Sequence, residues 1–188
     1  MKTLIAIFGK SASGKDTLCR QLCEKLPNAH KIKLDTTRPR RKNESDDDYN
    51  FISIEDMLKH LQDFPFGYYT VGYRHWYYGV NIIKEISEND LCIGVFSPKM
   101  IDKIYDMEHL HNLIGNQFRI IPIYIDQDWQ ERLHRSIERE GHLKPEMLRR
   151  LVADAFDFRK IERRLVKNFG SLIYTQDSSL EDIVYPLT

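Results

Sequence analysis

The sequence predicts an α/β protein built on a parallel central sheet. Short apolar segments alternate along the chain with longer segments of helical periodicity, which is typical of parallel strands joined by helices. The first apolar segment, 2–8, leads into a glycine-containing loop that is followed by a helical pattern. The chain has 188 residues and 41% of them are hydrophobic, so we expect one domain with a buried core.

In the first half of the chain, each expected element follows from local residue types. The apolar segment 2–8 predicts a buried strand, and the pattern over 15–26 predicts a helix that ends before Pro27, because proline cannot continue a helix. A short strand is expected at 31–34, and the polar segment 35–50 is expected to be an exposed loop. The elements expected next are a helix over 54–62 with an acidic start and short strands in the aromatic segment 67–79.

In the second half, apolar strands again alternate with helices. The segments 90–96 and 118–126 are apolar enough to be central strands. A helix over 145–168 is favoured because Pro145 suits a helix start and Gly170 lies just past its end. The remaining expected elements are a helix over 129–137, a polar segment over 138–144 and a last strand over 172–175.

The loop between the first strand and the first helix carries the clearest chemical signal. Residues 9–15 read Gly-Lys-Ser-Ala-Ser-Gly-Lys and fit the pattern G-x-x-x-x-G-K in the context that this pattern requires. Glycines let successive backbone N–H groups surround a phosphate, and Lys15 reaches the β- and γ-phosphates of ATP. The predicted ATP phosphate-binding residues are Gly9, Ser11, Ala12, Ser13, Gly14, Lys15, Asp16 and Thr17.

The residue after Lys15 departs from the usual pattern, because Asp16 stands where a serine or threonine normally binds Mg²⁺. Mg²⁺ prefers oxygen ligands and keeps several waters, so either Asp16 or Thr17 could hold it. In the alternative interpretation, Asp16 only favours the start of the helix electrostatically.

A second signal lies in two segments after the second expected strand. Residues 36–41 read Thr-Thr-Arg-Pro-Arg-Arg, and residues 48–51 read Asp-Tyr-Asn-Phe. Arginine grips phosphate well because its planar fork donates two parallel hydrogen bonds. Taken by itself, the segment fits a solvated charged loop, offset by the acidic residues 46–48, better than a phosphate-binding segment.

The order of these motifs resembles the guanylate kinase family over most of the chain, from about residue 3 to residue 183. That family has a P-loop, a T-T-R-x-P-R segment, a D-Y-x-F segment, a Y-G pair and a lid flanked by arginines. The resemblance implies a three-layer P-loop kinase fold with a parallel central sheet. It also implies one domain, 1–188, whose core (1–34 and 81–188) carries an inserted acceptor-binding subdomain (about 35–80) and a short lid (about 138–146).

The resemblance also implies residue roles. Lys15, Arg139 and Arg150 would surround the transferred phosphoryl group. The acceptor phosphate would be held by Arg38, Arg41 (or Arg40, since the segment is one residue tighter here), Tyr49 and Tyr78. The implied activity is ATP- and Mg²⁺-dependent phosphorylation of a nucleoside monophosphate.

The positions that would read guanine do not match the family. Leu34, Gly67-Tyr68-Tyr69, Val80 and the segment 95–98 (Val-Phe-Ser-Pro) stand where serine, glutamate, serine or threonine, and two aspartates are usual. Guanine N–H donors left without acceptors would cost about 1–3 kcal/mol each. We therefore expect altered recognition of the base, and the positions that correspond to the base or sugar contacts are Tyr69, Val80 and Ser97.

Two other interpretations remain open. Ribose 1,5-bisphosphate phosphokinases resemble this chain in their G-K-D-[ST] loop ending and in lacking the strand aspartates, although they typically lack the D-Y-x-F segment. Inactive guanylate kinase-like binding modules are similar too, but they tend to lose the P-loop, which is intact here.

Composition argues against several other classes of protein. Lys+Arg 28 and Asp+Glu 28 balance, which argues against a nucleic-acid-binding protein. No apolar run approaches the length of a membrane-spanning helix, and the three cysteines have no metal-site spacing. We expect a cytoplasmic monomer or homodimer that binds small-molecule nucleotides.

Overall fold

The computed structural model of the chain describes residues 2–40, 44–63, 68–73, 76–113, 118–145, 147–155, 158, 172–175 and 178–184. No helix in these ranges is long and apolar enough to cross a membrane.

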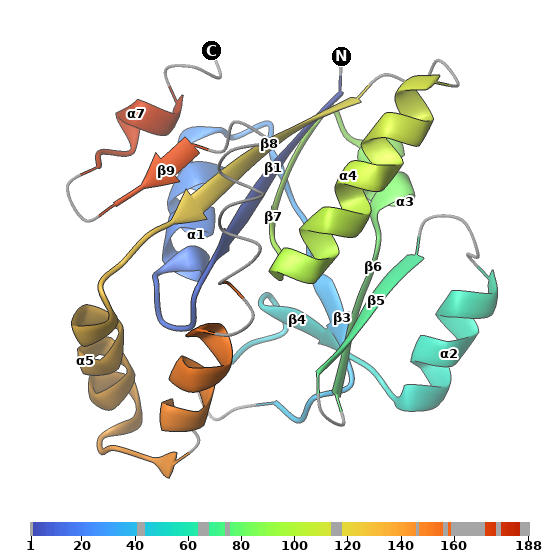
Figure 1. Cartoon of the computed structure of the whole chain (residues 1–188). Coiled ribbons are helices and arrows are strands. Elements are labelled where there is room, and N and C mark those ends of the chain that lie inside the picture. Colours follow the sequence, from blue (N-terminus) through green and yellow to red (C-terminus); the bar gives the residue numbers. More distant parts are fainter. Residues whose placement is uncertain are drawn as a thin grey trace.

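A five-stranded sheet forms the centre of the molecule (Figure 1). Its strands are β1 (Lys2–Gly9), β2 (His30–Lys31), β7 (Leu91–Val95), β8 (Phe118–Ile125) and β9 (Leu172–Tyr174). They lie in the order β2-β7-β1-β8-β9, and every neighbouring pair is parallel. The predicted parallel central sheet is confirmed, and the carboxyl ends of its strands meet along one edge, where ligands bind in folds of this class.

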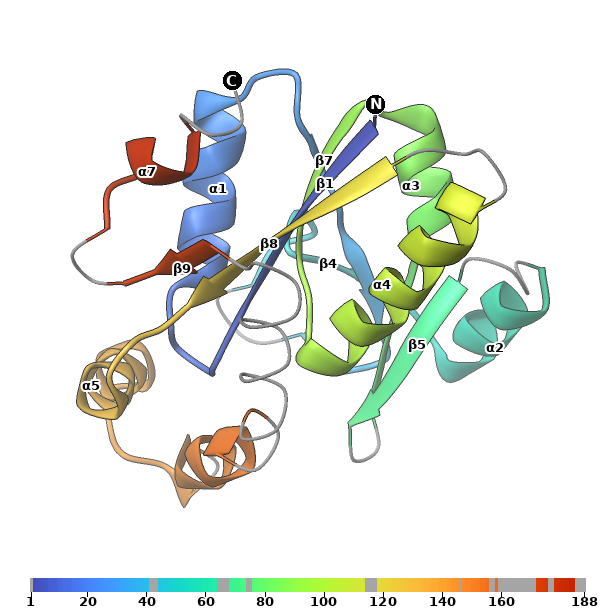
Figure 2. The same ribbon diagram turned by 45° about the horizontal axis from the view of Figure 1, so that its top comes forward.

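The two faces of this sheet are covered by different helices, which gives three layers (Figure 2). Side chains of β1 alternate between the faces, so Leu4, Ala6 and Phe8 enter one core and Ile5 and Ile7 enter the other. The first core also takes side chains from α3 (Ile82–Glu88) and α4 (Pro98–Leu113), and the second takes them from α1 (Lys15–Lys25) and α7 (Glu181–Val184). All five β1 side chains are fully buried, which fixes the strand that carries the P-loop.

A smaller mixed sheet with the order β4-β3-β6-β5 lies beside the core. Its strands are β3 (Leu34–Thr36), β4 (Tyr49–Phe51), β5 (Tyr68–Tyr73) and β6 (Trp76–Asn81), and α2 (Ile54–Asp63) accompanies it. Strand β3 pairs parallel to β4 and antiparallel to β6, and β5 pairs antiparallel to β6. This sheet occupies the range expected for the acceptor-binding subdomain, although its role stays a prediction.

The prediction of a single strand at 31–34 is wrong, because the chain passes from the central sheet to the smaller sheet within this segment. Lys31 belongs to β2 and pairs with Ile93 of the central sheet, whereas Leu34 begins β3 and pairs with Tyr49. The N–H of Ile32 still donates to the carbonyl of Ile93 at 2.8 Å, and the chain leaves the central sheet after this bond. The segment expected to be one loop, 35–50, likewise contains the end of β3 and the start of β4.

The sequence did not predict α3 and α4. In the part of α4 whose side chains are described, Met100, Ile101 and Ile104 are fully buried. A further difference is that α5 (Trp129–Glu140) runs three residues beyond the expected end at 137 and stops at Gly141, whose φ of 80° suits glycine. The expected lid therefore begins inside a helix.

The cysteines behave as core side chains. Burial raises the pKa of Cys19 to about 12 and that of Cys92 to about 11. Since the thiolate is the reactive form, both thiols should react with iodoacetamide at pH 7.5 at least tenfold more slowly in the native protein than in urea. Mass spectrometry of timed samples measures this, and rapid native labelling of Cys92 would contradict the description of its surroundings.

Candidate active site

The loop before α1 is shaped by two glycines and one strained residue. A Cβ on Gly9 would lie 2.7 Å from Ser13 Oγ and 2.9 Å from the carbonyl of Ile125, so no larger residue fits without movement. Gly14 caps α1 with φ of 96°, and Ala12 has φ of 61°, a conformation that L residues seldom adopt. This geometry turns the chain sharply from β1 into the N-terminus of α1, where helix dipole and N–H groups favour an anion.

Lys15 folds over this loop, and its Nζ donates to the carbonyl of Lys10 at 2.8 Å. Desolvation by burial lowers the pKa of Lys15, whereas Asp16 and Asp154 raise it and Arg132 and Arg139 lower it further. Lys15 is therefore held in a partly enclosed position, where a bound phosphate would favour its protonated form.

Two cavities meet at Lys15. The first, of about 300 Å³, extends from the P-loop to the N-terminus of α4 and to the smaller sheet. The second, of about 460 Å³, lies over the start of α1 and is also lined by Gln127, Arg135 and Tyr174. The residues that line both cavities are Ala12, Lys15, Asp16 and Arg139. A group held between these residues faces both cavities at once, which is the arrangement that transfer between two bound molecules needs.

Most residues predicted for the two substrates line one of these cavities. Gly9, Ser11 and Ala12 line the first, whereas Ala12, Ser13, Gly14 and Thr17 line the second. The predicted residues Tyr49, Tyr78, Ser97 and Arg150 line the first cavity together with Lys15 and Arg139. The structure therefore brings together residues that are far apart in the sequence.

Asp16 and Thr17 are both exposed in the first turn of α1. Asp16 lines both cavities, and Thr17 lines the second. Within the described residues, no group of three or more His, Cys, Asp or Glu side chains could hold a metal ion.

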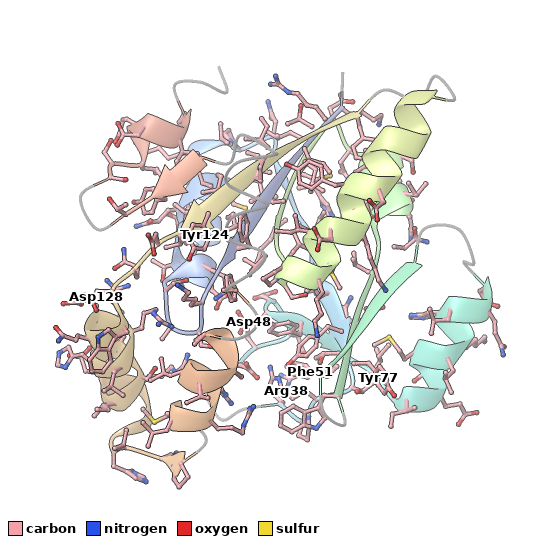
Figure 3. The ribbon with its side chains drawn as sticks, viewed as in Figure 1. Arg38, Asp48, Phe51, Tyr77, Tyr124 and Asp128 are labelled. Atoms are coloured by element: carbon pink, nitrogen blue, oxygen red, sulfur yellow. The ribbon has the colours of Figure 1, made fainter. Side chains whose placement is uncertain are left out.

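Arg38 is buried behind the first cavity rather than on its wall, with a residue exposure of 4%. Its guanidinium donates to Glu44 at 2.7 Å and to the carbonyl of Pro39 at 2.8 Å. It lies 5.4 Å from the ring centre of Tyr49 and 5.8 Å from that of Phe51, and Figure 3 shows Arg38 next to Phe51. Burial by itself would lower the pKa of Arg38, but Glu44 and Tyr78 outweigh this effect. The net result is a raised pKa, so the guanidinium stays charged.

The remaining predicted positions are placed less directly. Val80 is 3% exposed in the core beside Leu34 and Phe96, and it does not line the first cavity. Tyr69 lies in β5 opposite Val80, but its side chain lies outside what the structure describes, as does all of Arg41. The contacts proposed for these residues stay predictions.

Sequence reasoning missed Asp154, Arg132, Arg135 and Arg149. Arg149 lines the first cavity, Arg135 the second, and Asp154 the first. Arg132 is 6% exposed and lies against the P-loop, where its Nη1 is 3.3 Å from Asp154. No motif distinguished these four from ordinary helix-surface charges, because only their position opposite a loop more than 100 residues away gives them a role.

Comparison with known proteins gives a consistent result. The family model described as "Guanylate kinase" matches residues 1–186. The chain is 26% identical over 175 residues to a guanylate kinase of Helicobacter pylori, covering 93% of this chain and 80% of that protein. It is 27% identical over 157 residues to a guanylate kinase of Symbiobacterium thermophilum, covering 81% and 69%.

The crystal structure of a guanylate kinase from Anaplasma phagocytophilum superposes with a TM-score of 0.62 at 19% identity. The superposition covers 99% of this chain and 82% of the Anaplasma chain, and it supports the P-loop kinase fold.

Proposed function

Because the chain belongs to the guanylate kinase family, we propose that it is a kinase that transfers the γ-phosphoryl group of ATP to the phosphate of a nucleoside monophosphate. The observation that carries the proposal is that two cavities meet at Lys15 and Arg139. ATP would occupy the cavity over the start of α1, with its phosphates in the P-loop. The acceptor would occupy the cavity that reaches the smaller sheet.

The proposed chemistry needs position and positive charge more than covalent participation. Negative charge spreads over three equatorial oxygens of the moving phosphoryl group, and cations placed around it stabilise that charge. Lys15, Arg139 and Arg150 line the first cavity and supply three such cations. Arg139 comes from α5 and Arg150 from the next helix, so closure of these two elements over the substrates would also exclude water.

The acceptor phosphate would be held beside the smaller sheet. Tyr49 and Tyr78 line the cavity there, and their rings stack edge to face with centres 6.1 Å apart. Arg38 lies behind Tyr49 and would reach the phosphate by exchanging its bond with Glu44 for one with the ligand. Arg41 would add a second guanidinium from a segment outside the described residues.

The base would be read without carboxylates. The described wall of the first cavity near the smaller sheet is largely apolar, with Leu34, Phe96 and Met100 among its residues. The sequence has no acidic residue between Asp63 and Glu85, so β5 and β6 offer no carboxylate to guanine N–H donors. An apolar wall favours a base that turns few hydrogen-bonding groups towards it, because a buried donor or acceptor left unpaired is costly.

When bound, Mg²⁺ would neutralise charge on the phosphates of ATP. Asp16 or Thr17 would supply a protein oxygen, directly or through water.

The test is an ADP-release assay with ATP and Mg²⁺ against GMP, dGMP, AMP, CMP, UMP, dTMP and ribose 1,5-bisphosphate. We expect turnover of a nucleoside monophosphate, with kcat/KM for GMP below that of the best acceptor. Turnover of the sugar bisphosphate alone would replace the proposal with a sugar-phosphate kinase. ATP binding without turnover of any acceptor would indicate a binding module.

A further inference from the structure

One carboxylate joins the P-loop to the helix that carries Arg150. Asp154 accepts the backbone N–H of Ser11 at 2.7 Å through one oxygen and the hydroxyl of Ser11 at 3.2 Å through the other. These two residues are 143 positions apart, and the Asp154 side chain is 14% exposed. A carboxylate that uses both oxygens on one residue fixes orientation as well as distance.

The same carboxylate orients a buried arginine of α5. Arg132 Nη1 lies 3.3 Å from Asp154 Oδ2 and 3.5 Å from the carbonyl oxygen of Ser11, and its side chain is 7% exposed. Removing Asp154 would leave this buried cation without its carboxylate, which is a costly state. Asp154 therefore links its own helix to both the P-loop and α5.

The position of Asp154 in its own helix gives this contact a consequence. Residues 147–155 are helical, and Figure 1 draws this segment in orange beside α5. Arg150 and Asp154 are four residues apart, so they lie on one face, and both line the first cavity. Phe158 continues that face into the core, where it is 4% exposed and its ring centre lies 6.3 Å from that of Tyr124.

A carboxylate at this place opposes the binding of anions nearby. Lys15 experiences the charge of Asp154, so the carboxylate is close to the site proposed for the ATP phosphates. Like charges repel, so this carboxylate weakens the attraction of the site for anions. Its bonds to Ser11 and Arg132, by contrast, tie the helix that carries Arg150 to the loop that leads to Lys15.

We propose that Asp154 is a positioning residue that fastens the helix of Arg150 to the P-loop at Ser11. The inference rests on the proposed kinase function. Its bonds hold Arg150 and Arg132 against the phosphate site, so its loss should slow phosphoryl transfer without weakening the binding of ATP. Displacement of a catalytic group by about 1 Å costs on the order of 100-fold in rate.

The test compares Asp154→Ala and Asp154→Asn with the wild-type chain in three measurements: exchange of the Ser11 amide hydrogen by NMR, ATP affinity by calorimetry, and kcat with the best acceptor. Asp90→Ala is the matched control, because Asp90 is an ion-paired carboxylate (3.7 Å from Lys2) that is 97% exposed and precedes the amino end of β7.

For Asp154→Ala we expect at least tenfold faster exchange of the Ser11 amide, a kcat lower by about 30- to 100-fold, and an ATP affinity equal to or above wild type. Asp154→Asn keeps one acceptor oxygen, so its amide exchange rate and its kcat should lie between those of the wild type and those of Asp154→Ala. It also serves as the test if the alanine variant does not fold.

Two results would overturn the inference: Ser11 exchange and kcat like those of Asp90→Ala, or a kcat loss matched by an equal loss of ATP affinity. If the wild-type chain phosphorylates no acceptor, the proposed function fails. The amide exchange and ATP affinity of the variants then still decide whether Asp154 fastens the loop.

Discussion

Replacing Lys15 by alanine should lower kcat by about 1000-fold, because removal of one preorganised donor to transition-state charge costs about 100- to 1000-fold, and a lysine protonated beside the bound phosphates would also supply positive charge. Lys15 is among the four residues that line both cavities, and its Nζ lies at the P-loop, 2.8 Å from the carbonyl oxygen of Lys10. The measurement is kcat in the ADP-release assay at saturating ATP and acceptor.

The same substitution should not destabilise the fold. Burial lowers the pKa of Lys15 below its ordinary value of 10.5, so the folded chain binds fewer protons there than the unfolded chain. The contribution of Lys15 to wild-type stability therefore rises with pH in the window just below 10.5, and the alanine variant should lack this contribution. Thermal melting at pH 7 and at pH 9.5 measures the difference. A variant that keeps wild-type kcat would remove Lys15 from the mechanism.

Replacing Arg38 by alanine should raise the KM for the acceptor by about 100-fold, since hydrogen bonds to a charged phosphate contribute about 1.5–3 kcal/mol each. The KM for ATP should stay near that of wild type, because Arg38 lies beside Tyr49 and Phe51 and away from the P-loop. Initial rates at varied acceptor and at varied ATP separate the two constants. A change in the KM for ATP alone would contradict this assignment.

The Arg38→Ala variant should also lose about 3 kcal/mol of stability, because it breaks a buried ion pair with Glu44, whose side chain is 14% exposed. Assays well below the melting temperature keep this loss from affecting the kinetics. Arg38→Lys keeps the charge without the planar fork and should recover part of the affinity. Lys33→Ala is the control, since Lys33 Nζ makes an exposed hydrogen bond to the carbonyl of Asp46 in the same region.

What the sequence determined by itself is the part of the molecule built from neighbouring residues. The strand, loop and helix that place Lys15 are contiguous from Lys2 to Lys25, so glycine positions and apolar periodicity were enough to predict them. The parallel central sheet followed in the same way, because alternating apolar and helical segments leave few other arrangements.

Tertiary structure alone decided the rest, because contacts between distant residues leave no local pattern. Residues 31–34 divide between two sheets because each half pairs with a different strand, at Ile93 and at Tyr49. Helix α4 forms where packing on the sheet buries Met100 and Ile104. The apolar periodicity of this segment is weak, so the sequence did not predict the helix. Asp154 and Ser11 are 143 positions apart in the sequence, so their contact forms only when the whole intervening chain has folded. No local pattern around Asp154 could therefore predict that it binds the phosphate loop.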